Sequence, residues 1–249
     1  DTKDALHNAV LLVNKFGFND KNLVSKFALL PIAQYLKYKN TSKYVLSSSM
    51  SDVQDQNIIQ RWLIVMLLRN IMGSNSDFKL QQMRRIIDAQ HDSFPAQEIL
   101  KTLGSSSSFS EEEIDFWLSY KYGSRYSYLI LSLLYVGRDW KDRHFQEDHI
   151  FPYSKLQRKE LRALDYDEDR VNRYLQLRDT ICNLELLDDI ENNDKRAKEF
   201  ASWIETRDDN FKKRHYIPML DSYSMDDFEQ FIAARKVMIK KTITSISFL

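Results

Sequence analysis

The stretch FQEDHIFPYSKL, residues Phe145–Leu156, decides the fold of the second half of this 249-residue chain. It places Asp148 beside His149, followed by an apolar residue, an aromatic residue and Pro152. Neighbouring residues of a strand point to opposite faces, so a strand that brings both side chains to one site must end or bend here. The dipeptide alone leaves two interpretations: His149 is a catalytic base beside a metal-binding carboxylate, or a buried histidine at an ordinary strand end.

The residues that distinguish these interpretations lie downstream. Asn183 lies 34 positions after His149. Asn192 follows nine positions later, and Lys195 three positions after that. This order predicts a strand, a long connection, a second strand (ICNLELL) and then a helix.

Residues of these types suit one-metal hydrolysis of a phosphodiester. Neutral histidine accepts a proton from water near about pH 7. Mg²⁺ prefers oxygen ligands and is commonly held by one or two protein oxygens, with water and phosphate completing its shell. Asp148 and the amide oxygen of Asn192 are suitable donors. Asn183, at the head of the facing strand, could hydrogen-bond the loop backbone and hold the imidazole of His149 in place.

The helix expected over residues 188–207, opened by Asp188 or Asp189, supplies a further criterion. At roughly 100° per residue, one face carries apolar side chains and the opposite face carries polar ones. The apolar face comprises Ile190, Ala197, Ala201 and Ile204, and the polar face comprises Asn192, Lys195 and Glu199. This arrangement favours Asn192 over Asn193 as a metal ligand.

The rest of the chain has the pattern of a helical protein. Only 5 Gly and 4 Pro interrupt 249 residues, which argues against a turn-rich β fold. Residues 1–137 form a predicted helical domain, which includes a helix capped by Ser110 and an all-apolar core helix within 125–136. Residues 138–249 form a second domain, with a charged helix over 155–178 and a capping box at Ser224 and Asp227.

Composition limits the partners. The 36 basic and 36 acidic side chains cancel, so DNA binding would depend on local patches. These are KLQRKELR (155–162), KRAK (195–198), FKKRH (211–215) and RKVMIKK (235–241). The greasiest runs are shorter than the roughly 20 residues that span a bilayer, so we expect no membrane. The single cysteine, Cys182, rules out an internal disulfide and fits a cytoplasmic setting.

Three segments carry a resemblance to a known family. EDHIFPYS, NLELLDDIEN and NDKRAKEF resemble the core of an HNH, or His-Me finger, nuclease: D-H-I-x-P, then N-L-x-L-L, then N-x-x-K. More closely, the chain resembles the C-terminal half of GmrSD-type and SspE-type bacterial defence proteins. KFGFNDKNLVSKFALLPIAQYLKYKN (15–40) and IQRWLIVMLLRNIMG (59–73) are similar to the helical region that precedes the nuclease core in those proteins.

The resemblance implies a mainly α fold, in which a helical region precedes a ββα-metal core with a helical insertion and a C-terminal helix. It also implies an endonuclease that uses Mg²⁺ or Mn²⁺ and acts on DNA, often phage DNA with modified bases. By the same resemblance His149 is the general base, Asp148 and Asn192 are metal ligands, Asn183 is the positioning residue and Lys195 contacts phosphate.

Two departures and two alternatives accompany this expectation. Cys182 stands where the family has glycine, and the 34-residue gap before Asn183 indicates a helical insertion. Family members also carry an N-terminal nucleotide-hydrolysing domain with a D-G-Q-Q-R motif, which is absent here, so that domain is expected only as a partner in a longer protein. The alternatives are a non-catalytic interaction or autoinhibitory module of a larger defence protein, and a nucleic-acid-binding protein with a decayed site.

Overall fold

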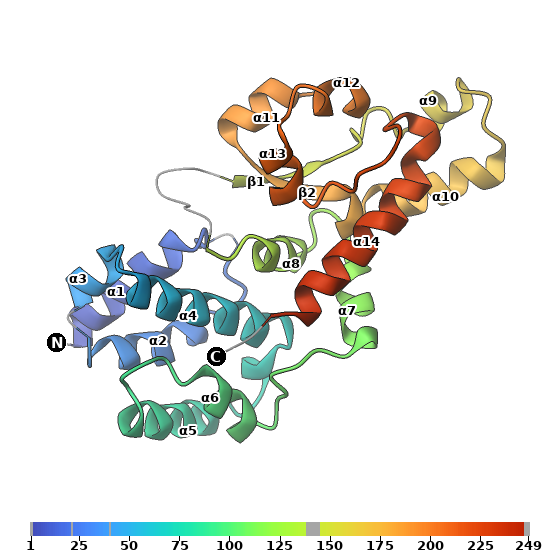
Figure 1. Cartoon of the computed structure of the whole chain (residues 1–249). Coiled ribbons are helices and arrows are strands. Elements are labelled where there is room, and N and C mark those ends of the chain that lie inside the picture. The colour runs from blue at the N-terminus through green and yellow to red at the C-terminus, as the bar shows by residue number, and fades with distance from the viewer. Residues whose placement is uncertain (1, 21, 40, 138–144, 247–249) are drawn as a thin grey trace. The chain divides into compact units, whose positions relative to one another are not determined.

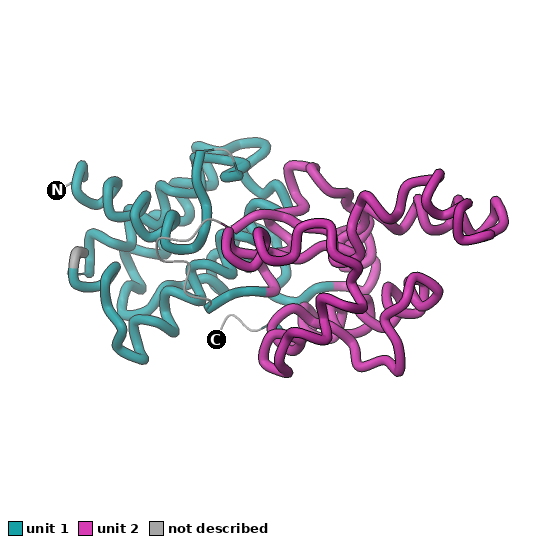
Figure 2. Tube along the Cα trace, turned by 90° about the horizontal axis from the view of Figure 1, so that it is seen from above, with its two compact units in different colours: residues 1–109, 135–141, 246–249 teal, residues 110–134, 142–245 magenta. Residues whose placement is uncertain are grey.

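The computed structural model describes residues 2–20, 22–39, 41–137 and 145–246 (Figure 1). Over these residues the fold is mainly α, with fourteen α-helices and one two-stranded antiparallel sheet. The chain divides into two compact units (Figure 2): unit 1 comprises residues 1–109, 135–141 and 246–249, and unit 2 comprises residues 110–134 and 142–245. The predicted domain boundary, near residue 138, lies outside the described residues and stays a prediction.

Unit 1 is built around a buried helix. Its helices are α1 (Thr2–Lys15), α2 (Leu29–Leu36), α3 (Thr41–Leu46), α4 (Met50–Leu68), α5 (Ser76–Ala89) and α6 (Ala96–Thr102). The side chain of Ser49 caps α4. Within α4, the buried carboxylate of Asp55 accepts hydrogen bonds from the hydroxyls of Tyr35 (2.5 Å) and Tyr44 (2.6 Å). These bonds tie α2 and α3 to the central helix.

Unit 2 contains the sheet and the remaining helices. Its elements are α7 (Glu111–Leu118), α8 (Ser127–Leu134), β1 (Phe145–His149), α9 (Arg158–Arg162), α10 (Glu168–Arg178), β2 (Leu184–Asp188), α11 (Asp189–Lys195), α12 (Phe200–Ile204), α13 (Asp209–Arg214) and α14 (Phe228–Thr244). β1 and β2 pair antiparallel, with Asp148 opposite Glu185 and His149 opposite Leu184. The long connection between the strands contains α9, α10 and a 3₁₀ turn, η3 (Ile181–Asn183).

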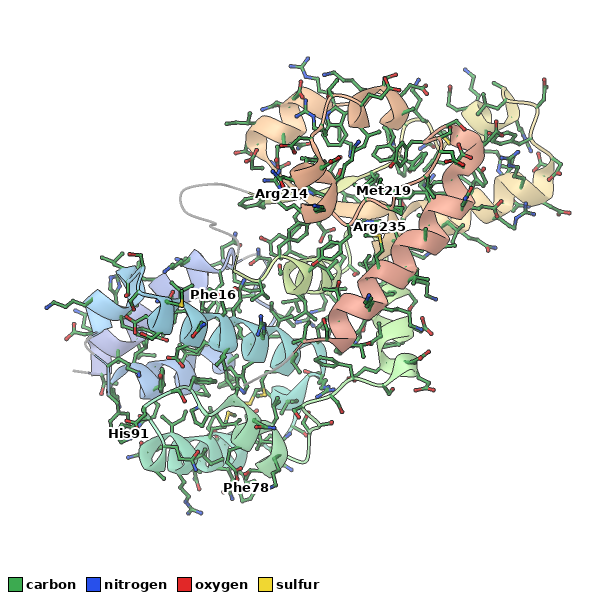
Figure 3. The ribbon with its side chains drawn as sticks, viewed as in Figure 1. Phe16, Phe78, His91, Arg214, Met219 and Arg235 are labelled. Atoms are coloured by element: carbon green, nitrogen blue, oxygen red, sulfur yellow. The ribbon has the colours of Figure 1, made fainter. Side chains whose placement is uncertain are left out.

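The side chain of Arg235 fixes α14 against the segment that enters β2. Although it carries a charge, Arg235 is fully buried. Its guanidinium donates to the carbonyls of Ile181 (3.1 Å), Cys182 (2.9 Å) and His215 (3.2 and 3.3 Å). Figure 3 labels Arg235 on α14 and Arg214 on α13. Arg235 thus satisfies backbone acceptors that would otherwise be buried without a donor.

Several predicted elements are confirmed. Ser110 caps α7, and Ser224 and Asp227 form a capping box before α14. α8 is buried at nearly every position, as its apolar sequence predicts.

In the described residues no helix is both long and apolar enough to cross a bilayer.

Two predicted helices are wrong in extent. Residues 155–178 contain two helices instead of one, and Leu164, which lies between them, is 49% exposed. The helix expected over 188–207 is also divided, although Asp188, one of the two caps predicted for it, does cap α11 through a capping box. α11 ends at Lys195 because Arg196 has φ 46° and ψ −131°, a backbone conformation that cannot continue a helix.

Candidate active site

His149 occupies the last position of β1. Its Nε2 lies 2.9 Å from Oδ1 of Asp179. Arg178 holds the same carboxylate, with Nη2 2.9 Å from Oδ2. Among the described residues, Nδ1 of His149 has no hydrogen-bond partner. One ring nitrogen of His149 is therefore held by a carboxylate, and the other makes no hydrogen bond within the described part of the chain.

Two tyrosines flank this imidazole. The ring centroid of His149 lies 4.6 Å from that of Tyr122 and 5.5 Å from that of Tyr153. Both tyrosines are half-exposed, whereas His149 is only 7% exposed. Burial lowers the pKa of His149, and the contact with Asp179 opposes that shift only in part. The imidazole is therefore neutral near about pH 7, the state in which it accepts a proton.

The amide of Asn183 joins the segment after β1 to the segment that carries Asp179. Its Oδ1 accepts from the backbone N–H of Phe151 (2.9 Å), and its Nδ2 donates to the carbonyls of Phe151 (3.2 Å) and Arg178 (2.8 Å). The Asn183 carbonyl also accepts from the N–H of Ile150 (2.8 Å). The loop hydrogen bonds predicted for Asn183 are thus present, while its catalytic role stays a prediction.

Gln146 and Asp148 both face α11, because alternate residues of a strand share a side. Nδ2 of Asn192 donates to Oε1 of Gln146 (3.2 Å), and Nζ of Lys195 donates to Oδ2 of Asp148 (2.6 Å). Asn192 and Lys195 therefore contact alternate residues of β1. The predicted ligands Asp148 and Asn192 therefore lie on the same side of β1, but Lys195 stands opposite Asp148.

Lys195 is buried at the centre of a polar cluster. Its Nζ donates to Asp148, to the carbonyl of His149 (2.8 Å) and to Oε1 of Glu185 (2.7 Å). Lysine has three N–H donors, so all are used. Because the side chain is 0% exposed, the predicted contact between Lys195 and phosphate has no counterpart in this geometry. The predicted apolar face of this helix is wrong within α11: Ile190 is 76% exposed and Lys195 is buried. The polar face of α11 packs inward because Asp148, the His149 carbonyl and Glu185 accept from the Lys195 ammonium.

Glu185 completes the cluster, although no sequence prediction named it. It is fully buried, and its Oε2 lies 3.1 Å from Nδ1 of His215. Nε of Arg214 donates to Nε2 of His215 (3.2 Å), so a neutral His215 carries its proton on Nδ1. The contact of Nδ1 with Oε2 of Glu185 is close, but it lacks the geometry of a hydrogen bond. Burial opposes ionisation of Glu185, but Lys195 and His215 lower its pKa to about 2. One signal could have identified it: Glu185 is the single charge in the apolar run ICNLELL.

The donors predicted for a divalent cation have suitable chemistry. The side chain of Asp148 is 25% exposed, and Lys195 uses only one of its oxygens. The hydrogen bond of Asn192 uses its nitrogen, which leaves its amide oxygen. Two protein oxygens completed by water and phosphate suit Mg²⁺ or Mn²⁺. Within the residues that the structure describes, no three His, Cys, Asp or Glu side chains converge on a metal position.

Each predicted basic patch contains cations that are paired with acidic side chains. The ion pairs are Lys155–Glu199, Arg158–Glu168, Arg162–Glu168, Lys198–Asp194, Arg214–Glu191, Lys236–Asp115 and Lys240–Asp115. A paired cation contributes less to the release of counterions from DNA, which drives much of non-specific binding. We therefore expect only modest DNA affinity from these patches.

No protein-family model matches this chain, and no curated protein matches it either. The geometry of unit 2 is therefore the observation on which a function can be argued.

Replacing Lys195 by methionine tests the polar cluster. We expect Lys195→Met to lower the free energy of unfolding by about 3–5 kcal/mol, because it leaves Glu185 buried beside no cation. Adding Glu185→Gln should recover part of that loss. Lys198→Met, at an exposed lysine with one ion pair, should change stability by less than about 1 kcal/mol. Urea denaturation measures all of these, and equal losses for Lys195→Met and Lys198→Met would contradict the assigned role.

The lowered pKa of Glu185 predicts acid sensitivity. A group whose pKa is depressed in the folded state stabilises the fold above its ordinary pKa, and this contribution is lost as pH falls through the folded value. Between its ordinary pKa of 4.5 and about 2, the ionisation of Glu185 should therefore contribute progressively less stability. Denaturation midpoints measured across this range should fall less steeply for Glu185→Gln than for the wild type. Parallel curves would contradict the assignment.

Proposed function

We propose that this protein is a metal-dependent endonuclease that hydrolyses DNA phosphodiester bonds, with β1, β2 and α11 as an HNH-type ββα-metal core. The observation that carries the proposal is the environment of His149. A neutral imidazole at the strand end has one nitrogen on a carboxylate and the other available, between two half-exposed rings. The antiparallel pair followed directly by a helix supports the proposed core.

In the proposed reaction, Nδ1 of His149 accepts a proton from the attacking water. Tyr122 and Tyr153 limit solvent around the imidazole, and Asn183 holds the loop that follows it. Asp148 and Asn192 would hold the divalent cation through their remaining oxygens. When bound, that cation supplies positive charge to the scissile phosphate and the leaving oxygen. Lys195 balances the charges of Asp148 and Glu185 from within the protein instead of contacting phosphate.

The biological setting is part of the same proposal. The resemblance of EDHIFPYS and NLELLDDIEN to the nuclease half of GmrSD-type and SspE-type proteins supports a cytoplasmic role in restriction of phage DNA, often with modified bases. An N-terminal nucleotide-hydrolysing domain would then belong to the same full-length protein. The ion pairing of the basic patches supports dependence on that domain for DNA affinity.

Substitution of His149 tests the activity. We expect the wild type to cleave plasmid DNA with Mg²⁺ or Mn²⁺, and His149→Ala to lose roughly 10²–10⁴-fold in rate, the usual contribution of a general base. His91→Gln is the matched control, because His91 lies in unit 1 and stacks on Tyr38. Equal cleavage by the wild type and His149→Ala would sink the role of His149. A full-length protein assayed in parallel identifies activity that requires the additional domain.

One observation favours the alternative, a non-catalytic module of a larger defence protein. The ammonium of Lys195 lies 2.6 Å from Asp148, where it competes with a divalent cation for that carboxylate. A measurement of Mn²⁺ binding distinguishes the nuclease from the non-catalytic module. The nuclease predicts binding, seen by electron paramagnetic resonance, that both Asp148→Asn and Asn192→Ala weaken about tenfold or more. Asp221→Asn, at an exposed aspartate, should leave Mn²⁺ affinity unchanged. Binding that is absent, or insensitive to both ligand variants, favours the module.

A further inference from the structure

We propose that Asp179 is a positioning residue for His149: it fixes the imidazole in the tautomer that carries its proton on Nε2 and its lone pair on Nδ1. This inference rests on the proposed function only for its catalytic consequence, because the tautomer itself is a property of the protein. Asp179 lies 30 residues from His149 in sequence, and its Oδ1 lies 2.9 Å from Nε2.

The chemistry of the two groups determines the direction of this hydrogen bond. Burial opposes ionisation of Asp179, but Arg178, which donates to both of its oxygens, holds the pKa of this carboxyl below the ordinary value. An ionised carboxylate only accepts hydrogen bonds, so Nε2 must be the donor. A neutral imidazole has one N–H, which leaves Nδ1 as the acceptor. This is the nitrogen without a hydrogen-bond partner among the described residues.

Arg178 holds the carboxylate in place. Its guanidinium contacts both oxygens of Asp179, with Nε 3.2 Å from Oδ1 and Nη2 2.9 Å from Oδ2. The same guanidinium lies 4.1 Å from the ring centroid of Tyr153 and donates to the carbonyl of Leu156 (3.3 Å). Only 16% of the Arg178 side chain is exposed. The cation that binds the Asp179 carboxylate is therefore held in place by its own contacts with Tyr153 and Leu156.

The backbone fixes the distance between Asp179 and His149. Asn183 binds the carbonyl of Arg178 and both backbone groups of Phe151, so one amide sets the spacing of the two segments. The carbonyl of Asp179 also accepts from the N–H of Tyr122 (2.8 Å), which brings that tyrosine beside the imidazole. Asp179 therefore orients His149, and the contacts made by Arg178, Asn183 and the backbone of Tyr122 hold Asp179 in place.

The tautomer can be measured without any nuclease activity. In ¹⁵N-labelled metal-free protein at about pH 8, above the ordinary histidine pKa, ¹H–¹⁵N correlation spectra of the five imidazoles report which nitrogen is protonated. The His149 signals are assigned by their loss in His149→Gln. We expect a single Nε2–H tautomer in the wild type and in Asp221→Asn, and a mixture of both tautomers in Asp179→Asn. Asp179→Glu should restore the Nε2–H form in part.

Two results would overturn the inference: a proton on Nδ1 in the wild type, or unchanged His149 signals in Asp179→Asn. Where the protein cleaves DNA, Asp179→Asn should also lower kcat about tenfold or more, within the 10²–10⁴-fold contribution of a general base, and leave KM nearly unchanged. Cleavage that survives His149→Ala would remove the proposed function while the spectra still decide the tautomer. The two proposals can therefore fail separately.

Discussion

The ammonium of Lys195 is the constraint on which unit 2 depends. A fully buried cation is tolerated only when its charge and all its donors are matched, and the three acceptors of Lys195 come from β1 and β2. One side chain of α11 therefore holds both strands and the helix in a fixed register. It also connects, through Glu185, to His215 after α13, so much of the ββα segment is organised around a single charge.

Asn183 provides the second constraint, and it acts on the backbone. The connection between β1 and β2 includes α9 and α10. Its two ends nevertheless lie close together, because the side-chain amide of Asn183 hydrogen-bonds both Phe151 and Arg178. An insertion between two strands is compatible with a rigid site when its ends are fixed in this way, because its interior can vary without moving them. Arg235 also holds the end of this connection, through the carbonyls of Ile181 and Cys182.

Sequence reasoning succeeded where the signal is local and failed where it depends on distant contacts. The caps at Ser110, Asp188 and Ser224, and the buried helix α8, are readable because a cap or a periodic pattern involves only neighbouring residues. The end of α11 before Arg196 has no such signal, since arginine is an ordinary helix residue. The contact that joins His149 to Asp179 spans 30 residues, and no local pattern singles out that aspartate.

The alternation of β1 determines how the motif Asp148-His149 can act. Asp148 faces α11 and His149 faces Asp179, so a continuing strand would hold them on opposite sides of the sheet. The regular pairing ends at His149, and the next two N–H groups bind the carbonyl and side chain of Asn183. A phosphate that contacts both groups must therefore lie beyond the end of β1. The termination of the strand by Asn183 is accordingly as necessary to the proposed chemistry as the two side chains themselves.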